Sequence, residues 1–469
     1  MTTEAVAEPW RAYAARVEAL RQQYDAIPAG TPVRLAKRTS NLFRARQAAA
    51  GPGLDVAAFD GVLAIDPVAR TADVQGMTTY EHLVAATLPH GLVPLCVPQL
   101  KTITLGGAVT GLGIESASFR AGLPHESVLE MDVLTADGEV RTVSGAPDDP
   151  HRGLFFGFAN SYGTLGYALR LRIELEPVEP YVQLRHLRLG TAAELAEVAA
   201  RITTEHSWDG VRVDFMDGTV FGPHEQYLTL GTKVAVPPPA TPTPSDYTGG
   251  QIYYRSIQQR SEDLLTISDY LWRWDTDWFW CSRAFGAQHP VVRRLWPKSR
   301  LRSDTYWKLV ALDRRYGVSR RLDAVLGRPE REFVVQDIEV PASRLAEFLE
   351  FFHREIGMRP VWVCPLRQRD PSAHWPLYQF DPHETYVNVG FWGTVPLPRG
   401  VDPASGRLNR RIEQVVTELG GRKSLYSSAF YGRDEFAAIY GGDTYASLKK
   451  TYDPDGRLLD LYGKCVESR

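Results

Sequence analysis

The residues best suited to hold a ligand lie in a glycine-rich stretch at residues 98–140. Glycine leaves the backbone free to adopt positive φ and to bring its N–H groups against a flat or anionic ligand, where a side chain would intrude. The glycines and the hydroxyl residues among them are Gly106, Gly107, Gly111, Gly113, Gly122, Thr102, Thr104, Ser116 and Ser118. This spacing favours a ligand-binding loop over a loop that serves only chain packing.

Two further stretches carry a different kind of chemistry. The first, at residues 269–286, holds Trp272, Trp274, Trp278 and Trp280. Such rings are suited to line an apolar cavity, to lie at a membrane interface or to fill an ordinary core. Between Val291 and Arg331, twelve Lys/Arg stand against four Asp/Glu, a local charge of +8 in a chain whose total is −3. This charge suits an anionic phospholipid surface or the phosphates of NADPH, and a solvated helical face is the remaining interpretation.

The glycine-rich stretch must be positioned by the elements around it. Residues 61–76 alternate as two strands, and the stretch at residues 78–94 predicts a helix that ends near Gly91. Residues 128–140 alternate again, and Asp137-Gly138 predicts a hairpin turn between two strands. Apolar residues at helical spacing over residues 10–24 predict an amphipathic helix, which we expect to pack on its own protein and not on a membrane.

Length and composition indicate a folded enzyme of more than one domain. At 469 residues and 44% hydrophobic content, the chain is too long for one simple core and predicts two domains. Beyond residue 180, alternating helix and strand patterns predict a mixed α+β substrate domain. A proline-rich interval at residues 234–250 predicts a surface loop.

The net charge and the positions of the cysteines exclude some classes of protein. A net charge of −3 argues against wholesale nucleic-acid binding, and four cysteines without metal-ligand spacing predict reduced thiols and no metal site. No apolar run reaches the roughly 20 residues that span a bilayer, and the N-terminus lacks a signal-peptide pattern. We therefore expect a cytoplasmic protein that is soluble or peripheral on the inner membrane face.

Several motifs resemble the FAD-binding oxidoreductases of the vanillyl-alcohol-oxidase (PCMH) type. They are TITLGGAVTGLGIES at residues 102–116, ADG at 136–138 and NSYGTLGYALRLRIEL at 160–175. The GIES tetrapeptide, together with VVQDIEVP, RPVWVCPL and YVNVGFWG in the last third, is similar to delta-24 sterol reductases and their bacterial methylene-fatty-acyl reductase relatives.

The resemblance implies an α+β fold, with a two-subdomain FAD-binding domain and an α+β substrate (cap) domain around a mixed or antiparallel sheet. We expect an N-terminal helix at residues 1–30, the FAD-binding domain at 31–180, the substrate domain at 181–420 and a C-terminal segment at 421–469 that returns to the flavin site.

The resemblance also implies which residues hold FAD. Residues 32–43 stand where this group of flavoproteins crosses the FAD pyrophosphate, and no histidine occurs there to tether the flavin, so we expect non-covalent FAD. The residues expected to bind it are Lys37, Arg38, Thr39, Ser40, Asn41, Pro98, Gln99, Thr102, Thr104, Leu105, Gly106, Gly107, Gly111, Gly113, Ile114, Glu115, Ser116, Ser118, Gly122, His125, Gly163, Thr164, Gly166 and Ser427.

An ene-reductase of this type needs an acid. An isolated alkene has no carbonyl to draw electron density, so protonation must lead or accompany hydride addition. The candidate acids are Glu115, His383, Glu384, Tyr426 and Tyr431. Glu115 has two interpretations, a flavin-pocket acid or a hydrogen-bonded brace. His125 is similarly open between a structural residue and a catalyst.

The reductant and the substrate follow from the same resemblance. We expect NADPH to reduce the flavin from within the flavin pocket, because no G-x-G-x-x-G opens a helix after a strand. The favoured substrate is a methylene-branched fatty acyl chain, because an Ala/Arg-rich sequence without a membrane segment looks bacterial and most bacteria make no sterols. The alternatives are a delta-24 sterol side chain, an oxidase acting on an alcohol or sugar, and a lipid-binding protein without flavin.

Overall fold

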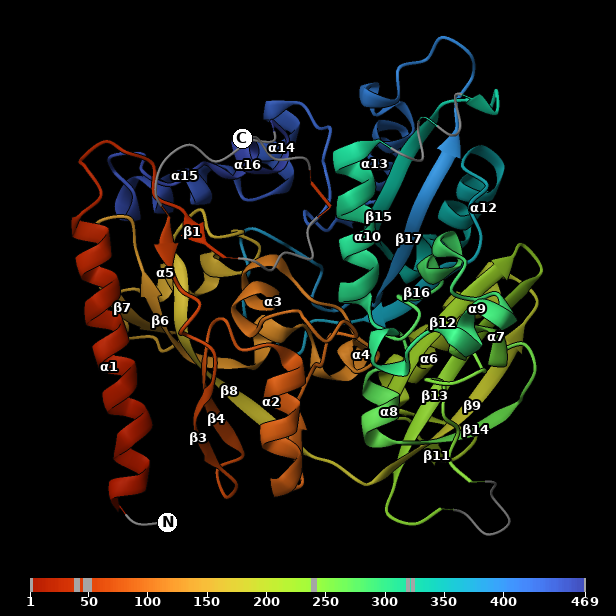
Figure 1. Ribbon diagram of the computed structural model, residues 1–469, viewed down its shortest axis with the longest axis horizontal. Coiled ribbons are helices and arrows are strands. Elements are labelled where there is room, and N and C mark those ends of the chain that lie inside the picture. Colours follow the sequence, from red (N-terminus) through yellow and green to blue (C-terminus); the bar gives the residue numbers. More distant parts are fainter. Residues whose placement is uncertain are drawn as a thin grey trace.

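The structure, a computed structural model, is built around two antiparallel sheets (Figure 1). It describes residues 3–37, 43–44, 53–237, 243–317, 321 and 325–467. The first sheet has the order β3 (Val62–Asp66), β4 (Thr71–Gln75), β8 (Tyr167–Pro177), β6 (Val128–Leu134) and β7 (Val140–Ser144), and β5 (Leu92–Pro94) pairs with β8. Every strand of this sheet precedes residue 180.

The second sheet follows residue 180 and has eight strands. Their order is β14 (Glu262–Thr266), β9 (Tyr181–Leu189), β13 (Glu225–Val234), β12 (Phe215–Gly222), β16 (Val361–Leu366), β17 (Tyr386–Pro396), β15 (Arg331–Pro341) and β18 (Arg422–Lys423). Each neighbouring pair is antiparallel, so the predicted α+β fold with an antiparallel sheet is confirmed.

The local predictions for the first sheet are confirmed. Residues 61–76 form β3 and β4, and the helix that follows is α2 (Tyr80–Thr87), capped by the Thr79 side chain. The predicted hairpin joins β6 to β7, and Gly138 has φ 85°, which a residue with a side chain rarely adopts. Alternation of apolar and polar residues was sufficient here because one face of each strand is buried.

The N-terminal helix α1 (Thr3–Asp25) packs on its own protein, as predicted. Tyr13 and Leu20 are buried, and the Tyr13 hydroxyl donates to Asp132 of β6 at 2.7 Å. Farther along the helix, the Tyr24 hydroxyl donates to the backbone oxygen of Ala136. These contacts hold α1 against the first sheet (Figure 1).

Helices also cover the second sheet. Those that pack on it are α6 (Ala192–Glu205), α12 (Leu345–Glu355) and α13 (Arg407–Glu418). They contribute Leu195, Ile202, Phe348, Phe352 and Ile412 to a core that is separate from that of the first sheet. None of the described helices has both the length and the hydropathy needed to cross a bilayer.

The C-terminal segment crosses back over the first sheet. Its helices are α14 (Arg433–Ile439), α15 (Gly442–Tyr452) and α16 (Leu461–Cys465). Figure 1 shows them above the N-terminal half of the molecule. Two lysines fix them there, since Lys449 Nζ donates to Thr164 O at 2.9 Å and Lys464 Nζ donates to Tyr162 O at 2.6 Å.

Candidate active site

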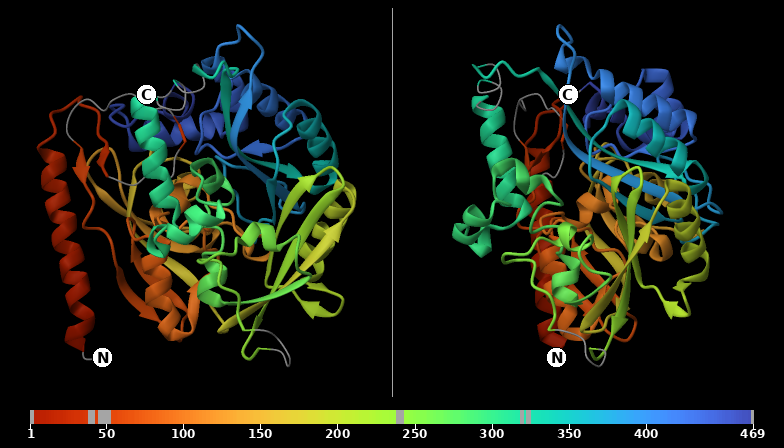
Figure 2. Two further views of the ribbon diagram at one scale, coloured as in Figure 1. Left: turned by 45° about the vertical axis from the view of Figure 1, so that its right-hand side comes forward. Right: turned by 90° about the vertical axis from the view of Figure 1, so that its right-hand side faces the viewer.

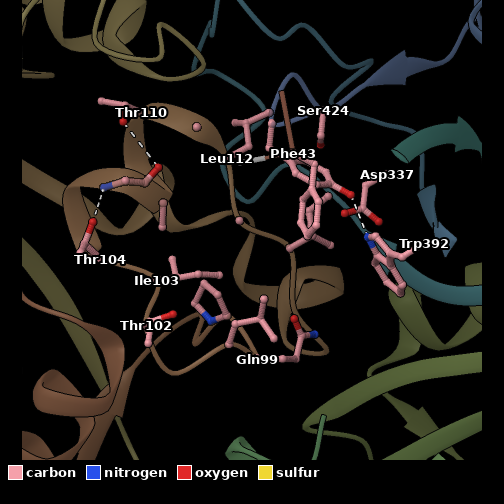
Figure 3. A pocket seen from close by; sticks show the side chains of 18 of the residues that line it. Phe43, Gln99, Thr102, Ile103, Thr104, Thr110, Leu112, Asp337, Trp392 and Ser424 are labelled. Atoms are coloured by element: carbon pink, nitrogen blue, oxygen red, sulfur yellow. Dashed lines mark hydrogen bonds between the residues drawn. The ribbon is translucent and has the colours of Figure 1, made fainter. Parts of the chain in front are cut away.

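A cavity of about 220 Å³ lies where the glycine-rich segment meets the second sheet (Figure 3). One side is formed by backbone and short polar side chains, namely Gln99, Thr102, Thr104, Gly107, Thr110 and Gly111. The facing side is formed by Trp278, Phe279, Asp337, Trp362, Trp392, Ser424 and Tyr426. Lys37, Phe43 and Tyr162 also line the cavity, and apolar residues of the glycine-rich segment lie among its polar ones, namely Pro98, Leu100, Ile103, Ala108, Leu112, Gly113 and Ile114. Segments far apart in the chain therefore build one cavity with a polar side and an aromatic side.

The glycine-rich segment contains a short helix, α3 (Leu105–Gly111), so the prediction of a loop over these residues is wrong. Thr104 caps this helix, and its hydroxyl accepts a hydrogen bond from the Gly107 N–H at 3.2 Å. The Leu105 N–H donates to Thr78 O and the Gly106 N–H donates to Gly76 O, each at 2.9 Å. The first N–H groups of α3 are therefore satisfied by the protein itself.

The glycines of this segment mainly allow close packing of the chain. A Cβ atom on Gly106 would lie 2.7 Å from Gly76 O, and one on Gly113 would lie 3.0 Å from ring carbons of Pro98 and Pro124. Of the five glycines in residues 98–140 that we singled out, only Gly122 has a positive φ. The expectation that positive φ brings this backbone to a ligand is therefore corrected to close backbone packing, with Gly107 and Gly111 left to face the cavity.

The aromatic wall draws on fewer of the predicted tryptophans than expected. Trp278 lines the cavity together with Phe279, whereas Trp274 and Trp280 are buried behind them. The Phe279 ring lies 4.3 Å from that of Trp392, measured between ring centroids. Phe43 stacks on Trp278 at 5.7 Å. This part of the lining is therefore aromatic and apolar.

One acidic group faces the cavity on this aromatic side. Asp337, on β15, lies close enough to the Tyr426 hydroxyl for each group to shift the pKa of the other, and the Tyr426 oxygen accepts the indole N–H of Trp392 at 2.8 Å. The amide of Asn388, on the neighbouring strand β17, approaches the Asp337 carboxyl at 3.5 Å. Burial raises the pKa of Asp337 to about 7 and holds the pKa of Tyr426 well above its ordinary value.

Glu115 lies outside the cavity lining in a buried polar cluster. The Gln99 amide donates to its carboxylate, and the Ser116 hydroxyl donates to it at 2.7 Å. Arg273 Nη1 lies 3.5 Å from Glu115, while Arg273 Nη2 pairs with Asp217 at 2.9 Å. Burial raises the pKa of Glu115 to about 7 although the Arg273 charge lowers it. This geometry matches the brace and not the flavin-pocket acid, because Glu115 reaches the cavity only through Gln99.

The other residues expected to bind FAD divide into three groups. Those on the cavity lining are Lys37, Pro98, Gln99, Thr102, Thr104, Gly107, Gly111, Gly113 and Ile114. Those that do not line the cavity are Leu105, Gly106, Glu115, Ser116, Ser118, Gly122, His125, Gly163, Thr164, Gly166 and Ser427. Arg38, Thr39, Ser40 and Asn41 lie outside the described residues.

The remaining candidate acids lie away from the cavity. His383 and Glu384 line a separate hollow beside α6, and Tyr431 is buried against Tyr440 in a cluster beneath the C-terminal helices. His125 packs its ring on Trp375 at 4.3 Å, and burial lowers its pKa to about 3, so it is neutral at physiological pH. Tyr426 is the one candidate acid that the structure places on the cavity lining.

Sequence reasoning missed Asp337 and Trp392. Both lie in segments quoted only for their resemblance, VVQDIEVP and YVNVGFWG. A usable signal was present, because Asp337 and Glu339 are two carboxyls at strand spacing next to the apolar residues Ile338 and Val340. Such residues share one face of the strand, and burying them requires a partner or a function.

Comparison with known proteins gives a consistent result over most of the chain. Residues 13–144 match the family model described as an FAD binding domain. A Delta(24)-sterol reductase homolog of Caenorhabditis elegans is 25% identical over 429 residues, 87% of this chain and 78% of the relative. The Delta(24)-sterol reductase of Arabidopsis thaliana is 24% identical, over 89% of this chain and 77% of the relative. Cytokinin dehydrogenase 5 of rice is 25% identical, over 83% of this chain and 72% of the relative.

Proposed function

We propose that this chain reduces an isolated C=C bond in an apolar lipid. It carries an FAD-binding domain and is an FAD-dependent oxidoreductase, as the sequence predicted. The proposed substrate is a methylene-branched fatty acyl chain, reduced to a methyl-branched one, with NADPH as the source of electrons. A delta-24 sterol side chain is the second candidate, favoured by the similarity to Delta(24)-sterol reductases. The observation that carries the proposal is the aromatic cavity beside the FAD-binding segment.

The residues on the cavity lining fit FAD. Gly107 and Gly111 present backbone without side chains, and Thr102 and Thr104 present hydroxyl groups beside them. Lys37, on the same lining, has the charge that would offset a pyrophosphate. These five residues would hold the cofactor, and reduced flavin, when bound, would supply the hydride to the alkene.

The protein's part in the reaction is to provide a proton and to exclude water. Hydride addition and proton addition together convert the alkene to an alkane, and the branched carbon carries positive charge as the proton arrives. The faces of Trp278, Phe279 and Trp392 suit that charge, because aromatic rings attract cations. Tyr426 places a hydroxyl on the same lining. The apolar wall also keeps water from the charged centre.

The oxidase alternative rests on the match to cytokinin dehydrogenase. A sugar or alcohol substrate would be served by a pocket with several polar groups, since buried hydroxyls need hydrogen-bond partners. The aromatic side of this cavity offers ring faces over most of its surface and few such partners. An apolar substrate therefore remains the better proposal.

Anaerobic bleaching and reoxidation test the proposed function. We expect the purified protein to be yellow and NADPH to bleach its flavin absorbance in the absence of oxygen. A methylene-branched acyl phospholipid should then restore the colour and be recovered as the methyl-branched product. Recovery of colour with a delta-24 unsaturated sterol alone would select the second candidate. Recovery with oxygen alone, or a colourless protein, would contradict both.

We further propose that the substrate is met at an anionic membrane surface. The basic stretch includes α9 (Pro290–Leu295) and α10 (Ser303–Tyr316), which Figure 2 shows projecting from one side of the molecule. Leu295 of α9 is 78% exposed and Leu312 of α10 is 54% exposed. Trp307 of α10 contacts the cavity residue Phe43 edge-on at 5.0 Å. Exposed apolar side chains among basic ones, close to the cavity, support contact with an anionic bilayer.

Vesicle binding tests this surface. We expect the protein to sediment with phosphatidylglycerol-containing vesicles and to be released as salt screens the attraction. Leu295→Glu should weaken vesicle binding at least about tenfold, because it removes an apolar contact with the bilayer and adds repulsion from the anionic headgroups. Val68→Glu is the matched control, since Val68 is 94% exposed in the turn between β3 and β4. Equal losses in the two variants, or no binding at low salt, would contradict the proposal.

A further inference from the structure

The cavity contains an acid whose proton has a defined route. Trp392 can only donate through its indole N–H, and it donates to the Tyr426 oxygen at 2.8 Å. The phenol hydrogen is thereby left to turn toward the cavity, which Asp337 also lines. Figure 3 shows Asp337 and Trp392 together on one side of the cavity, with Thr102 and Thr104 on the other. A proton on Asp337 can therefore reach the cavity through a single hydroxyl.

Asp337 is held where a carboxylate is poorly stabilised. No ion pair joins it to any lysine or arginine in the part of the chain that the structure describes, and its other contact is the neutral Asn388 amide. Opposite it on β17, Gly390 leaves room for the group, because a Cβ there would collide with both the Asp337 carboxyl and the Trp392 ring. Without a cation, burial favours the neutral acid.

A second buried carboxyl lies next to Asp337 on the same face of β15. Glu339 accepts the Ser424 hydroxyl at 3.1 Å and is also bonded to the Tyr378 hydroxyl. Burial raises its pKa to about 8, and the Asp337 charge adds to the effect. The titratable groups that face Asp337 are thus Glu339 on its own strand and Tyr426 on the segment after β18. Two carboxyls so close resist double ionisation, so the pair retains a proton at neutral pH.

We propose, on the premise of the proposed function, that Asp337 stores the proton of the reduction and delivers it to the alkene through Tyr426. The Tyr426 O–H bond breaks as the new C–H bond forms, and the Asp337 proton moves to the phenol oxygen. The hydride accounts for both electrons, and the Asp337 carboxylate left behind regains its proton from solvent after turnover. Asp337 acts through Tyr426 and is therefore a positioning and proton-storing residue.

The test uses Asp337→Asn, which keeps the shape of the neutral acid and removes its proton. We expect the variant to bind FAD and to be bleached by NADPH at the wild-type rate, because neither step needs the acid. Its reoxidation by the alkene should slow by about 10²–10⁴-fold. The wild-type reoxidation rate should fall as pH rises through about 7, because the acid form is the active one, and the variant should lose this dependence. Asp66→Asn, at an exposed turn, is the control for the substitution itself.

An infrared measurement tests the stored proton without substrate. The resting wild-type protein should show a carboxylic acid C=O band that titrates near pH 7 and is absent from Asp337→Asn. Tyr426→Phe should slow reoxidation to the same extent while it keeps the band. An unchanged reoxidation rate in either variant, or a spectrum unaffected by Asp337→Asn, would overturn the proposal. If the band titrates but no alkene reoxidises the wild type, the proposed function fails while the stored proton on Asp337 stands.

Discussion

Replacing Arg273 by Met lowers the free energy of unfolding by about 3–5 kcal/mol. Arg273 is fully buried after α8 (Ile267–Leu271), and it is the cation for Asp217 at 2.9 Å and for Glu115 at 3.5 Å. Its removal leaves two buried carboxyls without a positive charge, although Trp274 and Trp362 still donate to Asp217. Denaturant unfolding of the purified variants, followed by circular dichroism, measures the loss.

The Arg273→Met loss depends on pH in a defined direction. The folded-state pKa of Glu115 already lies above its ordinary value, so its contribution to stability is full below the unfolded pKa and decreases as pH rises through about 7. Without Arg273 that pKa rises further, and the variant should lose more stability at higher pH than at lower pH. Arg201→Met, which breaks the exposed Arg201–Glu205 pair, is the control and should cost under about 1 kcal/mol. Equal costs for the two variants would show that the buried cluster is not a brace.

Replacing Gly76 by Ala destabilises the protein by at least about 3 kcal/mol and releases FAD. Gly76 lies at the end of β4, where its N–H donates to Leu169 O and its carbonyl accepts the Gly106 N–H, each at 2.9 Å. A Cβ on Gly76 would overlap the carbonyl oxygen of Ala168. The backbones of Gly76, Leu169 and α3 are tied together by these hydrogen bonds. We therefore expect the overlap at Gly76 to displace α3 from the cavity lining.

The ratio of flavin to protein after purification, together with thermal unfolding, measures the effect of Gly76→Ala. Gly153→Ala is the matched control, because a Cβ there meets only Leu448 at 3.6 Å and Ala favours the helix α5 (Arg152–Phe158). That control should retain FAD and be at least as stable as the wild type. Full FAD occupancy in Gly76→Ala would show that the close packing of α3 on β4 is not required for the cofactor.

The sequence was most informative where one local pattern determines one local structure. Alternation over residues 61–76 and 128–140 identified strands, because burial of a strand face selects apolar residues at every second position. Asp137-Gly138 identified the turn of the second hairpin, because a positive φ selects glycine. The FAD-binding domain was recognised by motif, and the family match at residues 13–144 confirms it.

The cavity was less predictable because its walls come from segments that lie far apart in the sequence. Gly106 was interpreted as ligand-facing, but a glycine required by a neighbouring backbone and one required by a ligand look the same in sequence. Glu115 and Asp337 are both carboxyls in apolar surroundings. Only the positions of Arg273 and Tyr426 distinguish the brace from the cavity acid. Those partners are distant in the chain, so the spacing of residues around Glu115 and Asp337 in the sequence does not indicate them.

The return of the C-terminal segment has a consequence for the order of events during synthesis. Phe43 is bonded through its N–H to Tyr426 O at 2.9 Å, and Ser424 and Tyr426 supply part of the cavity lining. All described strands except β18 precede residue 421, so the rest of both sheets can assemble while the ribosome still holds residues 421–469. The nascent protein can therefore form most of both sheets before the cavity lining is complete. Translation must pass Tyr426 before a cofactor can be enclosed.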